Sequence, residues 1–411
     1  MSETKDDSRQ FPKDDRNAWI VALGSFLAMF SVGLLNATGT FQAYLEKHQL
    51  HSYSPGIISW IFGVYVFLAY FCAIQAGPVF DARGPRPLMV TGIVLTTIML
   101  ATMGNCSHYA HFLAVIGIVG GTGASMVQTS AISVISHFFQ RHRGVAMGAA
   151  SSGASIGGIC IPLLMDKLTP RIGWSWATRV VALVCFILAV IGCLLMRSTQ
   201  PKKSGWSAVM PTLSILADPV VGLTAASIFF QEWGLFVPLN YLPSYGIDYG
   251  ISTSLAHQTL SILNASSFFG RFISGLVSDR VGHFNTLFLT VTLCLVTTVG
   301  LWFSSAGSLP LLIVYCIGFG FANGSNISLA AVCVGQLCDT ADYGHYYSTV
   351  YTVASFAPLT SMPIAGEILT RCSGKYWGLI TFSACCYAMA AICIFAAKLW
   401  HTGFQRLWVR W

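Results

Sequence analysis

The chain has 411 residues, of which 55% are hydrophobic and only 9% are charged, and its formal net charge is +7. A typical soluble domain carries about 25% charged residues, so this composition argues against a soluble enzyme. The basic residues lie mainly in short segments between apolar runs and form no nucleic-acid-binding motif. The positive charge therefore does not indicate a nucleic-acid partner.

Two further features concern processing and metal binding. Residues 1–17 are polar and lack the apolar core of a signal peptide, so we expect the first apolar run to be a retained helix. The thirteen cysteines are scattered and form neither a Cys-x-x-Cys pair nor a zinc-ligand spacing. We therefore expect no metal site and no cofactor.

Twelve apolar runs follow, and a membrane-spanning helix needs about 20 such residues. The runs lie near 18–43, 56–79, 88–106, 111–136, 145–165, 174–196, 219–243, 253–277, 285–305, 308–334, 347–370 and 376–398. The ninth and tenth runs are the hardest to delimit, because only Ser305, Ala306 and Gly307 part them. The pattern predicts an all-α, multi-pass membrane protein with twelve transmembrane helices.

The distribution of basic residues between the runs predicts the orientation. With twelve helices both termini lie on the same side of the membrane. Most of the Lys and Arg residues in the tails and between the runs lie on that side. The other side holds only Lys47, Lys167, Arg171, Arg371 and Lys375. Basic loops stay in the cytoplasm, so both termini are expected to be cytoplasmic. We also expect the plasma membrane, although no targeting signal separates it from the vacuole.

A polar stretch at 197–205 divides the runs six and six, which predicts two six-helix halves. The expected parts are a cytoplasmic tail, the N-terminal half, a cytoplasmic linker, the C-terminal half and a second tail, at 1–17, 18–196, 197–218, 219–398 and 399–411.

A pattern G-x-x-x-D-x-x-G occurs once in each half, after the second run and after the eighth. The first glycine permits close helix approach, the aspartate can accept hydrogen bonds from the free N–H groups of a neighbouring helix, and the second glycine permits a tight turn. Matching positions in the two halves favour a duplicated transporter over two unrelated polar turns. We expect these residues to lock the halves together on the cytoplasmic side: Gly77, Asp81 and Gly84, and Gly275, Asp279 and Gly282.

These features resemble the major facilitator superfamily, whose loop after the second helix carries this pattern followed by Arg, here Arg86. The chain also resembles the fungal branch of the monocarboxylate-porter family. That resemblance rests on G-x-F-Q-x-Y-x-E at 39–46 and on LNASSFFGR at 263–271. It implies a secondary active transporter. Porters of lactate-like acids have a Lys near the end of the first helix and an Asp one turn before the eighth-helix Arg, where this chain has Asn36 and Ser267.

Ionisable residues within membrane segments are candidates for function, because each costs at least about 2.5–3.5 kcal/mol to insert. Arg271 in the eighth run can bind a carboxylate through two N–H groups, or serve as an anchor that snorkels to the inner surface. Glu232 in the seventh run can exchange a proton because burial disfavours its charged form, or form a hydrogen bond to another helix. Asn36, Asn264 and Trp233 are further candidates for cargo binding, with interhelical packing as the alternative.

The leading hypothesis is alternating-access export of a small amphipathic organic compound, such as a fungal secondary metabolite, because the Lys and Asp of the lactate carriers are absent. The alternative is proton-coupled uptake of a monocarboxylate, vitamin or related nutrient. The expected partners are the lipid bilayer, protons and the small organic molecule. An organic acid is one candidate for that molecule. No Walker-A loop is present. Two other classes are a membrane-embedded enzyme using His137, His142, His345 and Asp339, and a nutrient sensor; we expect no enzyme.

Overall fold

The computed structural model describes residues 14–196 and 213–402, and this part of the chain is helical without any strand. The N-terminal half contains α1 (Arg16–Ser31), α2 (Thr38–Lys47), α3 (Pro55–Phe71), α4 (Ala73–Arg83), α5 (Pro85–Met103), α6 (Tyr109–Phe112), α7 (Gly121–Phe138), α8 (Arg143–Ile172) and α9 (Trp174–Leu195). The C-terminal half contains α10 (Pro219–Asp248), α11 (Thr253–Val281), α12 (His283–Thr297), α13 (Leu309–Gln336), α14 (Tyr343–Ala354), α15 (Phe356–Arg371) and α16 (Trp377–Thr402).

Shorter helical pieces complete these elements. Three are 3-10 helices, η1 (Gly33–Asn36), η4 (Leu213–Ala217) and η6 (Thr340–Asp342). Two are π-helical, η2 (Leu113–Gly120) and η5 (Thr298–Trp302). The tails and linker expected from the sequence lie outside the described residues at 1–13, 197–212 and 403–411.

Ten helices in the described ranges are long and apolar enough to cross a membrane, and they correspond to ten of the twelve expected runs. The other two runs, near 18–43 and 347–370, are each divided into two helices too short to meet that test alone. The first is divided by η1, where the chain presses against α8: a Cβ on Gly33 would lie 2.4 Å from the carbonyl carbon of Gly157. The second is divided at Ser355, since Pro358 has no N–H to donate to the Ala354 carbonyl.

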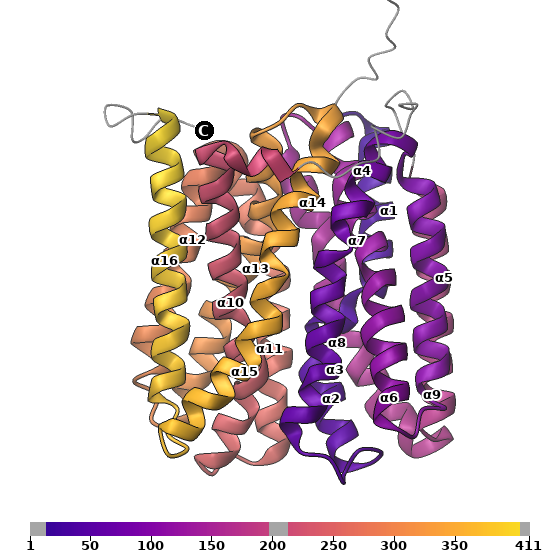
Figure 1. Ribbon diagram of the computed structural model, residues 1–411, viewed down its shortest axis with the longest axis vertical. Helices are drawn as coiled ribbons and strands as arrows, with labels where there is room; N and C mark the ends of the chain where they lie inside the picture. Colours follow the sequence, from indigo (N-terminus) through magenta and orange to yellow (C-terminus); the bar gives the residue numbers. More distant parts are fainter. Residues whose placement is uncertain (1–13, 197–212, 403–411) are drawn as a thin grey trace, which may run out of the picture.

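The two halves stand side by side with their helices running along the long axis of the molecule (Figure 1). The start of α1 and the end of α16 lie at the same end of the bundle. Asp14, the first described residue, donates from its backbone N–H to the Phe138 carbonyl, so the end of α7 lies there too. This end also carries both G-x-x-x-D-x-x-G patterns, and we call it the motif end.

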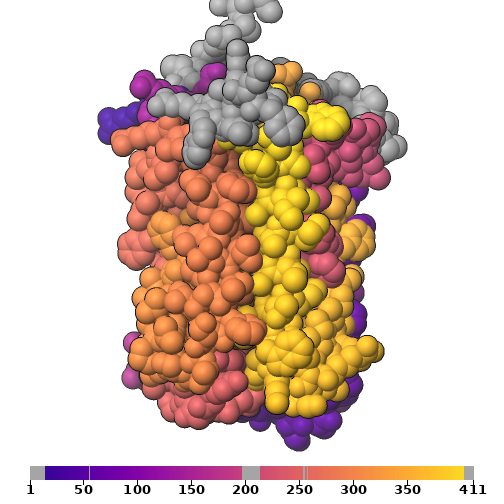
Figure 2. Space-filling model, turned by 90° about the vertical axis from the view of Figure 1, so that its left-hand side faces the viewer, coloured from indigo at the N-terminus to yellow at the C-terminus, as the bar shows by residue number. Residues whose placement is uncertain are grey.

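The lateral surface is apolar, as expected for a wall that contacts lipid. Figure 2 shows the C-terminal half, where α16 runs down the face beside α12. Ile392 on α16 and Val296 on α12 are 60% and 57% exposed. Leu183 and Leu194 on α9 are 57% and 72% exposed on the other half. Large apolar side chains left exposed in such numbers indicate a surface covered by the bilayer.

Candidate functional site

The aspartate of the first pattern binds the start of a helix in the other half. Asp81 ends α4 and is only 4% exposed. Its carboxylate accepts hydrogen bonds from the backbone N–H groups of Gly344 and His345 at 3.0 and 2.9 Å, in the first turn of α14. These N–H groups have no partner within their own helix, and the helix dipole favours a negative charge beside them. The His345 ring nitrogen Nδ1 also lies 2.7 Å from the carboxylate.

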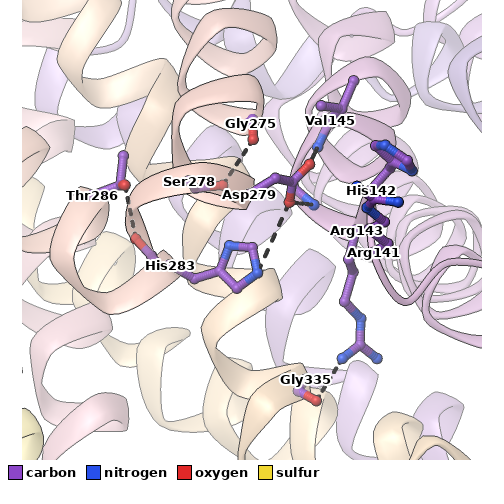
Figure 3. Close-up of polar contacts among 12 residues, drawn as sticks. Arg141, His142, Arg143, Val145, Gly275, Ser278, Asp279, His283, Thr286 and Gly335 are labelled. Carbon is purple, nitrogen blue, oxygen red and sulfur yellow. Dashed lines mark hydrogen bonds and ion pairs between the residues drawn. The ribbon is translucent and has the colours of Figure 1, made fainter. Parts of the chain in front are cut away.

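The second pattern repeats this contact with the halves exchanged. Asp279, near the end of α11, accepts hydrogen bonds from the backbone N–H groups of Gly144 and Val145 at 2.8 and 3.2 Å. These residues form the first turn of α8, in the N-terminal half (Figure 3). His283 places Nε2 3.9 Å from the same carboxylate. Each half therefore holds the start of one helix of the other through an aspartate, which is buried in the case of Asp81 and partly buried in the case of Asp279.

The glycines of the patterns allow these contacts. A Cβ on Gly77 would lie 2.1 Å from the Gly344 carbonyl oxygen, and one on Gly275 would lie 2.4 Å from the Gly144 carbonyl oxygen. The second glycines form the turns that follow α4 and α11, where Gly84 has φ 81° and Gly282 has φ 106°. Only glycine adopts such angles without strain.

The last residue of the first pattern lies apart from these contacts. Arg86 is exposed in the first turn of α5. Within residues 14–196 and 213–402 Arg86 forms no hydrogen bond or ion pair, and its positive charge lies near Cys193 on α9. The structure therefore brings together six of the seven expected gating residues.

Replacing Gly77 by alanine is expected to force α4 and α14 apart, because the added methyl would overlap the Gly344 carbonyl and the Ser348 side chain. The ratio of closed to open molecules at the motif end should fall at least about fivefold, since overpacking costs typically 1–3 kcal/mol. Distances between spin labels at the exposed positions 83 and 280 would report the separation. Gly63→Ala is the matched control, because nothing lies within 4 Å of its Cβ position. Equal distances in both variants would contradict the steric account.

Arg143 adds a third link between the halves at the motif end. It begins α8, and its guanidinium donates a 2.6 Å hydrogen bond to the carbonyl of Gly335, in the last turn of α13. The same group lies 5.5 Å from the centre of the Tyr343 ring. A cation at a helix C-terminus is stabilised by the helix dipole. Sequence reasoning missed this residue, whose only signal was its place beside Gly144 at the start of a helix.

Asp14 binds the segment just before α8. Its carboxylate accepts hydrogen bonds from the backbone N–H groups of Arg141 and His142, both at 3.0 Å. Partial burial raises the pKa of Asp14, but these backbone donors more than offset the effect, so its pKa lies below the ordinary value. The start of α8 is thus held by two carboxylates, one from each half.

The two charged residues expected inside the membrane lie deep in the bundle. Arg271 on α11 is 2% exposed and Glu232 on α10 is 5% exposed. Arg271 donates from Nη1 to the backbone carbonyl of Ser151 on α8, across the two halves. The Glu232 carboxyl interacts with the hydroxyl of Tyr70 on α3. Both charged residues therefore contact the opposite half.

Arg271 and Glu232 interact electrostatically but form no direct ion pair within the described residues. Nε of Arg271 and Oε2 of Glu232 are buried without a hydrogen-bond partner there. Buried polar atoms are nearly always paired. These unpaired atoms therefore mark a place where a polar ligand or a changed conformation would complete the hydrogen bonding.

A group of tyrosines surrounds this pair, and sequence reasoning missed it. Tyr347 and Tyr351 lie one turn apart on α14 with ring centres 4.4 Å apart, and the Tyr70 ring lies 5.5 Å from that of Tyr351. Gln128 on α7 donates to the Tyr347 hydroxyl at 3.5 Å. The four-residue spacing of Tyr343, Tyr347 and Tyr351 was the available signal, since it places three rings on one helix face.

The remaining candidates divide into two groups. Asn264 on α11 donates from Nδ2 to the Asn36 carbonyl at 3.0 Å, which joins the halves at η1. The Asn36 side-chain Nδ2 is buried without a partner in the described part. Trp233 instead packs against Phe229 and Phe382 with ring centres 5.3 and 5.2 Å apart, between α10 and α16. The structure therefore places Trp233 in an aromatic cluster of the C-terminal half.

A cleft of about 320 Å³ lies between the halves, away from the motif end. From the N-terminal half it is lined by α2 and α3, with Gln42, Glu46 and Lys47, and from the C-terminal half by α10 and α15, with Asn240 and Tyr241. Among the described residues, the bundle is thus joined by paired contacts at the motif end and hollow at the opposite end.

The histidines considered for an enzyme do not converge. His345 is bound to Asp81, His142 lies 3.3 Å from the Asp14 carboxylate, and His137 is buried against the Phe80 ring. Asp339 is exposed. No group of three or more His, Cys, Asp or Glu side chains suited to a metal occurs in the ranges that the structure covers.

Comparison with known proteins identifies the family. The sequence profile of the Major Facilitator Superfamily matches residues 21–359. A fujikurins efflux protein of Gibberella fujikuroi is 30% identical over 95% of this chain and 84% of its own length. The riboflavin transporter of Saccharomyces cerevisiae is 30% identical over 100% of this chain and 84% of its own length. The solved structure of a proton:xylose symporter superposes with a TM-score of 0.75 at 14% identity, covering 94% of this chain and 95% of that one. The chain is a multi-pass membrane protein and belongs to the major facilitator superfamily.

Proposed function

We propose that the protein exports a small amphipathic organic compound, such as a fungal secondary metabolite, by alternating access. The observation that carries this proposal is the pair of reciprocal aspartate contacts at one end of the bundle, opposite a cleft between the halves. The direction is supported by the name of the Gibberella fujikuroi relative, an efflux protein. The relatives' names also support transport rather than catalysis.

The contacts at the motif end suit a gate because each hydrogen bond is strong, and only a few of them have to break for the two halves to separate. Each aspartate accepts two hydrogen bonds from N–H groups of the opposite half, and such bonds to a charged group contribute about 1.5–3 kcal/mol each. When the halves rock, Asp81 and Asp279 release α14 and α8, the motif end opens and the cleft closes. The cargo then meets the buried polar groups from the other side of the membrane.

Arg271 and Glu232 are proposed to bind the cargo and to couple it to protons. A guanidinium with a free Nε binds an acidic or carbonyl group of the cargo, and the carboxyl next to Tyr70 takes up or releases a proton. Asn36 and Asn264 line the same boundary between the halves. Trp233 stays a candidate only for indirect effects through its aromatic cluster.

The chain's subfamily, orientation and division also remain proposals. The motifs at 39–46 and 263–271 support the fungal branch of the monocarboxylate porters. The excess of basic residues supports cytoplasmic termini in the plasma membrane, with the cleft facing outward. Halves at 18–196 and 219–398, joined by a linker, fit the arrangement of the described helices.

A second candidate function is proton-coupled uptake of a monocarboxylate, vitamin or related nutrient. It is favoured by the riboflavin transporter among the relatives. The two functions use the same gate and differ in the direction of net movement.

Deletion of the gene in the native host, with untargeted metabolite profiling of cells and medium, tests the direction. Export predicts one or a few compounds that accumulate in the cells and are depleted from the medium. Uptake predicts a nutrient that stays in the medium while the cell contents are otherwise unchanged, and this result would overturn the export proposal.

Glu232→Gln is expected to uncouple transport from protons. The amide keeps the size of the side chain and can bond to the Tyr70 hydroxyl, but it cannot gain or lose a proton. Accumulation driven by a pH gradient across proteoliposomes should fall at least about fivefold, the lower range of coupling energies, while exchange at equal pH persists. Glu367→Gln is the control, because that carboxylate is exposed and pairs with Arg371 at 2.7 Å. Unchanged gradient-driven transport in Glu232→Gln would rule out this role.

A further inference from the structure

A second cavity lies within the N-terminal half and has no part in the cycle above. Its volume is about 370 Å³, it is partly open to the surface, and α2, α8 and the start of α9 line it. Thr40, Phe41, Tyr44 and His48 of α2 line this cavity, whereas Gly39, Gln42, Ala43 and Glu46 of the same helix line the cleft between the halves. The helix α2 therefore separates two independent cavities. A volume above 300 Å³ accommodates a small organic molecule.

Aromatic rings form one wall of this α2–α8 cavity. The Tyr44 ring stacks on Trp174 with centres 4.2 Å apart and planes 9° apart, and on His48 at 4.1 Å and 14°. Phe41 meets the Trp174 ring edge-on at 6.2 Å. Pro162, Met165 and Pro170 of α8 complete an apolar wall. Flat, rigid side chains of this kind favour a planar apolar ligand.

Two polar groups of the lining have no partner. The indole N–H of Trp174 and the hydroxyl of Thr169 are buried without a hydrogen bond among the described residues. Tyr and Trp usually find a partner for their polar atom when buried. An acyl chain of a lipid would fill the cavity but would leave both donors unpaired, whereas a carbonyl oxygen would pair with them.

The charged side chains of the lining indicate the net charge of the ligand. The lining residues include no Lys or Arg; His48 is the one basic side chain among them and Asp166 is the one acidic side chain. Burying an anion without a paired cation is costly. A neutral ligand with an acceptor oxygen therefore fits better than a carboxylate.

We propose that the α2–α8 cavity binds an uncharged, planar aromatic compound through its carbonyl oxygen, with Trp174 and Thr169 as donors and Tyr44 and Met165 as walls. This site is separate from the gate and from the Arg271–Glu232 region. Ligand binding at this site does not depend on the direction of transport. The binding would therefore persist if the export proposal failed.

Photolabelling of the full-length protein with benzophenone, a neutral diaryl ketone, tests this site. On irradiation the ketone oxygen takes a hydrogen atom from a nearby C–H bond, and the two carbon radicals then join, so the product keeps every atom of both partners. The C–H bonds beside the Met165 sulfur are favourable targets. Peptide mass spectrometry is expected to find saturable labelling on the segment that contains Met165.

Trp174→Phe supplies the decisive variant, because it keeps an aromatic ring and removes only the N–H donor. Labelling at Met165 should fall about fivefold, the effect of one ordinary hydrogen bond. Trp176→Phe is the matched control, since Trp176 is 61% exposed, lies outside the lining and should change nothing. Labelling spread evenly over lipid-facing helices, or labelling at Met165 that Trp174→Phe leaves unchanged, would overturn the proposal in favour of simple membrane partitioning.

Discussion

Asp279→Ala is expected to reduce transport below about one tenth of the wild-type rate and to leave the motif end open. The variant removes two hydrogen bonds from the backbone of α8 to a nearly buried carboxylate. The loss of about 3 kcal/mol or more shifts an evenly balanced pair of conformations by roughly a hundredfold, so nearly every molecule would occupy one state. Spin-label distances across the motif end and transport in proteoliposomes would measure the two effects.

A matched variant separates the gate from general charge effects. Asp339 also lies at the motif end but is exposed and caps no helix through its side chain. Asp339→Ala should therefore keep both the wild-type distances and the wild-type rate. The reciprocal contact predicts that Asp81→Ala resembles Asp279→Ala, since Asp81 holds α14 in the same manner. A closed motif end in both single variants would show that the aspartates do not form the gate.

Arg271→Ala is expected to lower transport at least about tenfold, since a hydrogen bond that involves a charged group contributes about 1.5–3 kcal/mol. The guanidinium is 2% exposed and is the cation nearest to Glu232 among the interactions described. Binding of the cargo to purified protein would be measured together with the melting temperature, because Arg271 also bonds to the Ser151 carbonyl. A cargo role predicts weaker binding in a protein that still melts cooperatively.

Arg280→Ala is the companion control for this prediction. Arg280 lies on the same helix, two to three turns nearer the motif end, and is exposed. Its removal should alter neither binding nor transport. Full transport by Arg271→Ala, or an equal loss in Arg280→Ala, would exclude a specific role of Arg271 in cargo binding.

The sequence predicted the helical fold well because apolar runs directly reflect the bilayer. Ten runs became candidate membrane spans at nearly the expected positions, one of them with a turn at Cys72 between α3 and α4. The runs near 18–43 and 347–370 were expected as single helices, but the structure breaks them at η1 and at Ser355. These breaks arise from tertiary packing of Gly33 on Gly157 and from a missing backbone donor at Pro358. The hydropathy of the sequence reveals neither the close packing of Gly33 nor the missing backbone donor at Pro358.

The contacts at the motif end were predicted in part. Both aspartates and their glycines could be found because they recur at equivalent positions of the halves. Their partners could not, since Gly144 and Gly344 are ordinary glycines in the sequence and become partners only when α8 and α14 meet the opposite half. His345 was considered for an enzyme, whereas the structure places it on Asp81. Which residues of the two halves contact each other depends on how the halves face each other in the folded protein. The sequence of one half does not show this.

The buried charged residues could be found from the sequence, but the residues that they contact could not. Glu232 and Arg271 stood out because charges in apolar runs are rare. Their neighbours Tyr70 and Ser151 carry no such signal, since tyrosine and serine are common in membrane helices. Trp233 was grouped with the cargo-binding candidates for its neighbourhood in the sequence, but helical geometry turns it away toward Phe382 on α16.

Transport by the purified protein in proteoliposomes, supplied with a total metabolite extract of the host, tests the central claim most directly. Mass spectrometry of the vesicle contents, with and without an imposed pH gradient, identifies what crosses the membrane. We expect one or a few unaltered amphipathic compounds to be concentrated in a gradient-dependent manner, and vesicles with Asp279→Ala to lose this enrichment. Enrichment equal in wild-type and variant vesicles, or chemically altered products in place of transported compounds, would contradict the central claim.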